Sequence, residues 1–145
     1  MKGLIQRVSH ARVDIGGKCV GAIERGVLLL LGVEKNDSEA DADKLLNKVL
    51  AYRIFPDVEG KMNLSVSDIH GGVLVVSQFT LVADTSRGLR PGFSGAAAPA
   101  EAKQLYQYFV YSLRARHRPT ASGVFAADMQ ISLVNDGPVT FMLSS

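Results

Sequence analysis

Two short segments of this sequence combine residue types that suit acyl-transfer chemistry, and the first covers residues 77–81 (Ser-Gln-Phe-Thr-Leu). Here the apolar run at residues 73–76 gives way to two hydroxyl residues, Ser77 and Thr80. Hydroxyls and backbone N–H groups at a strand end can hold the oxygen that becomes negatively charged when an ester or amide is cleaved. The segment therefore predicts a site that works without histidine or metal.

The second segment, residues 135–141 (Asn-Asp-Gly-Pro-Val-Thr-Phe), places the Gly137–Pro138 peptide in a turn between two strand-like runs. A backbone carbonyl at such a turn can project outward and select a ligand by shape alone. Both segments also have an ordinary interpretation. A hydroxyl in a strand is usually a packing residue or a local backbone partner, and a Gly-Pro turn is usually only a turn.

The chemistry available to the first segment is limited by the absence of an obvious base. Thr80 is the natural nucleophile, yet a threonine hydroxyl is weak unless a base lies within hydrogen-bond reach. His10, His70 and His117 fall in segments predicted as a turn, a turn and a helix end. We expect the backbone N–H groups of residues 78–80 to stabilise an oxyanion. Metal motifs, phosphate loops and dinucleotide fingerprints are missing from the sequence, so we expect no metal and no cofactor.

The bulk composition is that of a globular protein. The chain has 145 residues, of which 47% are hydrophobic and 21% charged, and we expect one domain spanning residues 1–145. The longest apolar run, residues 27–33, is far shorter than the roughly 20 residues of a membrane span, and the first residues lack a signal peptide's apolar core. We therefore expect a cytoplasmic protein. The single cysteine, Cys19, is predicted to be a packing residue.

The net charge of +2 permits RNA binding without requiring it. Arg87 and Arg90 fall in a loop rich in glycine and proline, and a second basic cluster stands at the end of a predicted helix: Arg114, Arg116, His117 and Arg118. Cations at a helix C-terminus are also favoured by the helix dipole alone.

The pattern of apolar residues predicts an α+β fold, with mixed β-sheets and two main helices on one face. A capping box at Ser38 begins the first helix, and Pro99 begins the second. The first helix is expected to bury Ala42, Leu45, Leu46, Val49 and Leu50, and the second Ala102, Leu105, Phe109 and Leu113. Strands are expected at residues 4–8, 11–15, 18–23, 27–33, 73–79, 129–133 and 139–143, with Gly16-Gly17 as a hairpin turn.

Taken together, these segments resemble the D-aminoacyl-tRNA deacylase family from end to end. The resemblance is carried by residues 4–8, 31–33, 52–57, 60–64, 77–81, 87–91, 126–129 and 135–141, in the same order and at the same spacing. It implies an enzyme that hydrolyses the ester at the 3′ end of D-aminoacyl-tRNA, acts as a homodimer and does not bind a membrane.

The resemblance also implies roles for particular residues. Ser77, Gln78, Phe79 and Thr80 would form the catalytic segment, while substrate binding and chiral selection would fall to Arg7, Met129, Gly137 and Pro138. The Gly137–Pro138 bond would be cis and would reach into the partner subunit's site, braced by Arg7. A rigid backbone group there excludes every L side chain, whereas glycine has none to exclude.

The mechanism and two other functions stay open at this point. We favour activation of water by the ribose 2′-hydroxyl of the tRNA over a covalent ester on Thr80. A non-catalytic tRNA-binding module would use the arginine-bearing loops to bind RNA without cleaving it. A hydrolase of small D-amino-acid esters would act equally on substrates without a 2′-hydroxyl.

Overall fold

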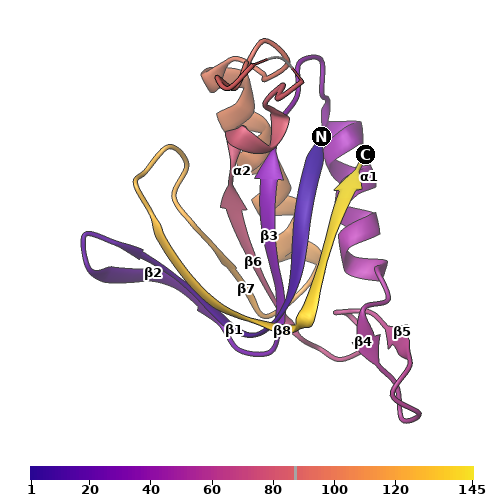
Figure 1. Ribbon diagram of the computed structural model, residues 1–145. Helices are drawn as coiled ribbons and strands as arrows, with labels where there is room; N and C mark the ends of the chain where they lie inside the picture. The colour runs from indigo at the N-terminus through magenta and orange to yellow at the C-terminus, as the bar shows by residue number, and fades with distance from the viewer. Residues whose placement is uncertain (87) are drawn as a thin grey trace.

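A six-stranded mixed sheet, ordered β2-β1-β3-β6-β7 with β8 also paired to β1, organises the computed structural model, which describes residues 1–86 and 88–145 (Figure 1). A separate small hairpin consists of β4 and β5. The elements are β1 (Lys2–Ile15), β2 (Lys18–Ile23), β3 (Gly26–Gly32), α1 (Glu39–Ala51), β4 (Phe55–Pro56), β5 (Met62–Leu64), β6 (Gly72–Ser77), the 3-10 helix η1 (Phe79–Val82), α2 (Pro99–Arg116), β7 (Thr120–Ser122) and β8 (Gln130–Ser144).

The β1–β2 hairpin confirms the predicted turn and corrects the predicted strands. Ile15 pairs with Lys18, and the two residues between them, Gly16 and Gly17, have φ of +55° and +78°. Positive φ at both central positions is typical of the tight turn that glycine favours. The two short strands expected before this turn are one strand, β1, whose first half pairs with β3 and whose second half pairs with β2. His10 therefore lies within a strand and not in a turn.

The last strand differs from the prediction in the same way. Residues 129–133 and 139–143 were expected as two strands joined by a turn, but both halves pair with β1 as parts of one strand, β8. The register shifts between the pairs Val8↔Asn135 and Gln6↔Thr140, so residues 136–139 bulge out beside Arg7. Such a bulge lets extra residues leave the sheet without reversing the chain.

Both helices cover one face of the sheet (Figure 1), as expected for the predicted α+β class. The capping box of α1 is present, because Ser38 and Asp41 each accept from the other's backbone N–H, and all five residues of its predicted apolar stripe are buried. Helix α2 begins at Pro99 as predicted. Its buried face is rotated from the prediction: Tyr106 and Val110 are buried with Phe109 and Leu113, whereas Ala102 and Leu105 are only partly covered.

The opposite face of the sheet packs against the curved halves of β1, β2 and β8 (Figure 1). The residues in this second core are Val8, Ala11, Val13, Ile23, Leu28, Leu74 and Val76. Strand β3 contributes to both cores, through Leu28 here and through Leu29 on the helix side. This explains why its sequence is apolar without alternation.

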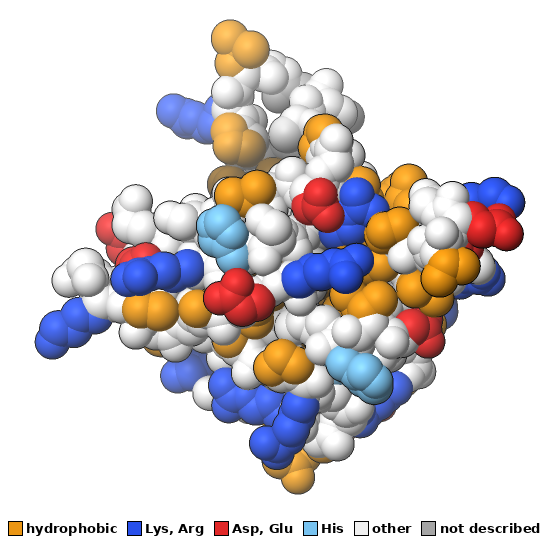
Figure 2. All heavy atoms as spheres, turned by 90° about the horizontal axis from the view of Figure 1, so that it is seen from below, with side chains coloured by type: hydrophobic (Ala, Val, Ile, Leu, Met, Phe, Trp, Pro, Cys, Tyr) orange, Lys and Arg blue, Asp and Glu red, His pale blue; other side chains and the backbone are white. Residues whose placement is uncertain are grey.

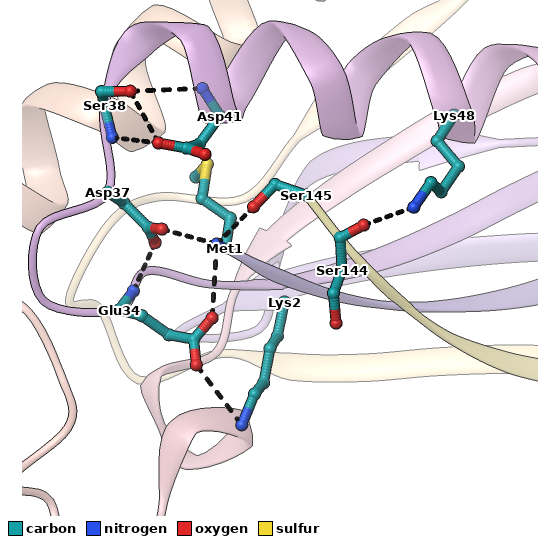
Figure 3. Close-up of polar contacts among 9 residues, drawn as sticks. All are labelled: Met1, Lys2, Glu34, Asp37, Ser38, Asp41, Lys48, Ser144 and Ser145. Carbon is teal, nitrogen blue, oxygen red and sulfur yellow. Dashed lines mark hydrogen bonds and ion pairs between the residues drawn. The ribbon is translucent and has the colours of Figure 1, made fainter.

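A polar cluster joins the two ends of the chain to the start of α1 (Figure 3). The α-amino group of Met1 donates to Asp37 Oδ1 (2.6 Å) and Ser145 Oγ (2.9 Å), and lies 3.3 Å from a carboxylate oxygen of Glu34. The Lys48 ammonium donates to the carbonyl of Ser144 (2.6 Å). Because the side chain of Met1 is fully covered, the ammonium group depends on these carboxylates for its solvation.

Three further expectations concern Cys19, Arg87 and membrane-spanning helices. Cys19 is exposed on β2, so its predicted role in packing is wrong; the hairpin strand simply presents it to solvent. Arg87, which the sequence places in a basic loop, lies outside the described residues. None of the helices in the described residues is both long and apolar enough to cross a membrane.

Candidate active site

A pocket of about 700 Å³ opens where the parallel strands β3 and β6 end, and we call this end of the molecule the pocket end. Its volume lies in the range of small-molecule sites. The walls come from four parts of the chain: Leu31 and Val33; Val76, Ser77, Gln78 and Phe79; residues Phe93 to Tyr106 in part; and Phe125 to Ile131 in part. Most of the lining is apolar, with Ser77, Gln78 and Asp128 as polar groups.

The predicted catalytic segment forms one wall of this pocket. Strand β6 ends at Ser77, because the N–H of Gln78 makes a last bond to the carbonyl of Leu31 (2.8 Å) and η1 begins at Phe79. The strand expected to run to residue 79 is therefore two residues shorter. The N–H of Gln78 is occupied, which removes it from the three expected oxyanion donors. The N–H groups of Phe79 and Thr80 are the first two of η1, and such groups have no carbonyl within their own helix.

Thr80 stands beside the pocket and does not line it. Its hydroxyl oxygen accepts a hydrogen bond from Gln78 Nε2 (2.6 Å), which fixes both side chains at the mouth. None of the histidines bonds to Thr80: the His117 ring contacts the carbonyl of Gly71 (2.7 Å), and His10 Nδ1 contacts the hydroxyl of Ser9 (3.3 Å). The geometry supplies a positioned hydroxyl without an adjacent base.

Aromatic side chains shape the pocket in a way that the sequence reasoning missed. Phe79 packs on Phe93, with ring centroids 5.2 Å apart, and both are exposed at the mouth. Tyr106 packs on Phe125 deeper in, and the Tyr106 hydroxyl lies 3.1 Å from the carbonyls of Val75 and Gly123. Burial raises the pKa of Tyr106 to about 12. Only the tertiary fold brings these rings together, although the glycine-rich loop around Phe93 was a signal.

Another wall of the pocket is the segment before β8, which includes the predicted site residue Met129. A Cβ built on Gly123 would lie 2.7 Å from the sulfur of Met129, so this glycine lets the methionine approach the backbone. Ala126 has φ of +60°, a left-handed conformation that turns the segment toward the pocket. The polarizable thioether of Met129 thus forms part of an adaptable apolar wall.

The second predicted segment forms the bulge of β8 at the other end of the sheet. We call residues 136–139 the Gly137–Pro138 turn and this end of the sheet the turn end. The Gly137–Pro138 bond is cis, and Gly137 has φ of +133°. Arg7 holds the preceding peptide: its Nε donates to the carbonyl of Asp136 (3.0 Å), and its Nη1 donates to the carbonyl of Ile54 (2.7 Å). Arg7 therefore links the turn to the backbone of Ile54.

Asn135 fastens the other side of this turn. Its Oδ1 accepts from the N–H of Val139 (3.0 Å), and its Nδ2 donates to Thr140 Oγ1 (2.9 Å). A Cβ on Gly137 would lie 2.7 Å from Cγ2 of Val139 and 3.1 Å from Nη2 of Arg7, so only glycine fits. The turn is fixed from both sides, while Gly137 and Pro138 themselves are exposed.

One chain does not bring its two predicted segments together. Gly26 and Gly72 begin the parallel pair at the turn end, whereas Ser77 ends it at the pocket end. Five residues of strand separate these levels, or roughly 16 Å at the usual rise of a strand. The residues Ser77, Gln78, Phe79 and Met129 therefore form one group, and Arg7, Gly137 and Pro138 form another. In the part of the chain that the structure describes, no three His, Cys, Asp or Glu side chains are arranged to hold a metal ion.

Comparison with known proteins gives consistent matches over the whole chain. Residues 4–144 match the family described as D-Tyr-tRNA(Tyr) deacylase. A D-aminoacyl-tRNA deacylase of Cellvibrio japonicus is 62% identical over 143 residues, which cover 99% of this chain and 98% of that protein. One of Stutzerimonas stutzeri is 60% identical, with both chains fully covered. The structure of a protein described as c-Myc DNA Unwinding Element Binding Protein superposes with a TM-score of 0.95 at 39% identity, covering 100% of this chain and 99% of that one.

Proposed function

Because this chain belongs to the D-Tyr-tRNA(Tyr) deacylase family, we propose that it is a hydrolase that cleaves the ester bond of D-aminoacyl-tRNA. The observation that carries the proposal is the pocket of about 700 Å³ that Ser77, Gln78, Phe79 and Met129 line together. Its size suits the aminoacylated terminal nucleoside, and its aromatic mouth suits an unstacked base.

The reaction is acyl transfer to water. Water adds to the ester carbonyl, the tetrahedral intermediate loses the ribose 3′-oxygen, which takes up a proton, and the amino acid leaves as a carboxylic acid. The N–H groups of Phe79 and Thr80 are the donors best placed for the oxyanion, and one such donor is commonly worth about 10²–10³ in rate. Since Thr80 has a hydrogen-bond donor beside it and no base, the ribose 2′-hydroxyl is the better candidate to orient the water.

Chiral selection is assigned to the Gly137–Pro138 turn of a second copy of the chain. The separation of the two segments within one chain supports this assignment, because a turn at the far end of the sheet reaches a pocket only from a partner. The rigid fastening of the turn by Arg7 and Asn135 suits a group that works by exclusion. Three exposed apolar side chains of β8, Val134, Phe141 and Met142, favour a homodimer.

Two consequences belong to the same proposal. Exclusion by shape does not act on glycine, so glycyl-tRNA is expected to be a substrate alongside D-aminoacyl esters. The enzyme is expected to act in the cytoplasm, where aminoacyl-tRNA is made and used. If glycyl-tRNA and L-alanyl-tRNA resist hydrolysis equally at matched enzyme concentration, the exclusion mechanism is contradicted.

The experiment follows the loss of D-tyrosyl-tRNA and L-tyrosyl-tRNA with the wild type and with Thr80→Ala. We expect only the D ester to be lost. Thr80→Ala should keep the rate within about tenfold, whereas loss of a covalent nucleophile typically costs 10³-fold or more. D-Tyrosyl-tRNA ending in 2′-deoxyadenosine, with the amino acid on the 3′-oxygen, should be nearly inert. If neither ester is lost while tRNA still binds, the binding-module function replaces the enzyme.

A further inference from the structure

A second cleft lies at the turn end, between the last turn of α2 and the start of β7. It has a volume of about 630 Å³ and is lined by Arg114, Arg118, Pro119 and Thr120. The Arg114 guanidinium is oriented by a bond from Nη2 to Ser122 Oγ (3.0 Å), and the hydroxyl of Thr120 donates to the carbonyl of His117 (2.9 Å). The cleft therefore presents two guanidinium groups from a fixed backbone.

The charge around this cleft is uncompensated. Residues 99–123 contain four basic side chains, three of them arginines within residues 114–118, and a single acid, Glu101, at the far end of α2. Within residues 1–86 and 88–145, no carboxylate lies within 4 Å of the charged nitrogens of Arg114 or Arg118. Arg116 is turned away toward Asn47 of α1. Figure 2, which views the molecule from below, shows Lys and Arg side chains gathered along the lower part of this face.

The cleft and the Gly137–Pro138 turn share one end of the sheet. Asn135 pairs with Val8, Val8 with Gly26, and Gly26 with Gly72, whose neighbour Val73 pairs with Thr120. Four steps between adjacent strands separate β8 from β7 along this row, or about 19 Å at the usual strand spacing. If the 3′ end of an RNA strand lies beside Pro138, phosphates a few nucleotides from that end can therefore reach the arginines of the cleft.

We propose that this cleft binds backbone phosphates of the tRNA acceptor strand. The inference rests on the proposed function, in which the Gly137–Pro138 turn of one subunit lies at the pocket of its partner. The arginines of the subunit that supplies the turn then flank the path by which the acceptor strand leaves the partner's pocket. Arg is suited to the task because its planar guanidinium can donate two parallel hydrogen bonds to a phosphate. Phosphate contacts of this kind fix the position of the RNA without reading its sequence.

The competing explanation is that these arginines only stabilise the C-terminus of α2 through the helix dipole. The two explanations differ in what a charge-removing substitution changes. A dipole role affects the free energy of unfolding and leaves RNA affinity alone, whereas a phosphate site affects RNA affinity and its dependence on salt. Salt dependence is therefore the decisive readout.

The test compares wild type with the double variant Arg114→Gln/Arg118→Gln, which removes both positive charges and leaves shorter, neutral polar side chains. Its control is Lys44→Gln/Lys61→Gln, which removes the same charge from two exposed positions on α1 and the β4–β5 hairpin. Three substrates or probes are used: D-tyrosyl-tRNA, 3′-O-D-tyrosyl adenosine without phosphates, and uncharged tRNA labelled for fluorescence anisotropy. Each is measured over a series of salt concentrations.

For the cleft variant we expect KM for D-tyrosyl-tRNA to rise about tenfold with kcat unchanged, and the slope of log affinity against log salt to fall by about 1.4–1.8, the value for two lost phosphate contacts. Turnover of the adenosine ester should not change. An unchanged KM and slope, or an equal change in the lysine control, overturns the inference. If the wild type cleaves neither ester, the proposed function fails, and the anisotropy slopes still decide whether the cleft binds RNA.

Discussion

The pocket end and the turn end of this sheet are built in opposite ways. The pocket is hollow and mostly apolar, and its polar groups are few: the side chains of Ser77, Gln78 and Asp128. At the turn end, the backbone around Gly137 is held from one side by Arg7 and from the other by Asn135. One region is shaped to receive a group, and the other to present one.

The difference suggests a division of labour between two copies of the chain. A receiving site needs space and donors, and a selecting group needs rigidity, because rejection by shape works only if the backbone cannot yield. Placing the two at opposite ends of a single sheet prevents them from closing on each other within one chain. Each copy can then supply what its partner's pocket lacks.

The largest expected effect comes from breaking the presenting end with Gly137→Ala. The new methyl would lie 2.7 Å from Cγ2 of Val139, at a φ of +133° that L residues rarely adopt, so the turn must shift. We expect hydrolysis of D-tyrosyl-tRNA to fall by about 10²-fold, since a displacement near 1 Å can cost that much. Circular dichroism should show an intact fold. Undiminished turnover in a folded variant would remove the turn from the mechanism.

A smaller effect is expected from Arg7→Gln, which loosens the same turn without adding bulk. The substitution removes the bonds to the carbonyls of Asp136 and Ile54. We predict about a tenfold loss of D-ester turnover and a measurable gain in L-ester hydrolysis, because a mobile turn excludes less well. The ratio of the two rates is the quantity to measure. A ratio equal to that of the wild type would mean that Arg7 only stabilises the fold.

The smallest effect is expected at the pocket end from Tyr106→Phe. Its hydroxyl lies 3.1 Å from the carbonyls of Val75 and Gly123, and losing one hydrogen bond typically costs about 1 kcal/mol of unfolding free energy. The carbonyl of Val75 keeps a bond from the N–H of Gly123 (2.8 Å), so it is not left without a partner. Chemical denaturation at pH 7 measures the difference. Loss of the fold would contradict this modest role.

The same variant gives a signed pH dependence. Burial raises the pKa of Tyr106 to about 12 from 10.0, so the folded state binds the proton more tightly than the unfolded state. The stabilisation is complete below pH 10 and is lost as the pH rises from 10 toward 12. The stability gap between wild type and Tyr106→Phe should therefore narrow over that interval. A gap that widens would contradict the assigned shift.

The sequence predicted local structure well and long-range assembly less well. The capping box at Ser38, the stripe of α1 and the Gly16-Gly17 turn depend on neighbouring residues, and all three are confirmed. The continuity of β8 could not be predicted, because Asn, Asp, Gly and Pro are common both in turns and in bulges. The two differ in whether the residues on both sides pair with the same strand, and here both sides pair with β1. Cys19 was misplaced because a hairpin strand does not reveal which of its faces is covered.

The roles of the predicted site residues stay predictions, but the structure shows which of these residues lie together. Ser77, Gln78, Phe79 and Met129 meet at the pocket, and Arg7 does bond to the turn that contains Gly137. The aromatic walls could not be predicted, because Phe93, Tyr106 and Phe125 gather only through the packing of α2 and two loops against the sheet. Residue spacing carries no information about such contacts.

The most direct test of the central claim mixes two inactive variants. Gly137→Ala keeps the pocket but loses the turn, and Ala102→Trp fills the pocket but keeps the turn. If each site combines the pocket of one copy with the turn of the other, a 1:1 mixture that exchanges subunits should recover about a quarter of wild-type D-tyrosyl-tRNA hydrolysis, because half of the dimers are mixed and one of their two sites is intact. A mixture of two folded, dimeric variants that stays as inactive as its components would contradict the account.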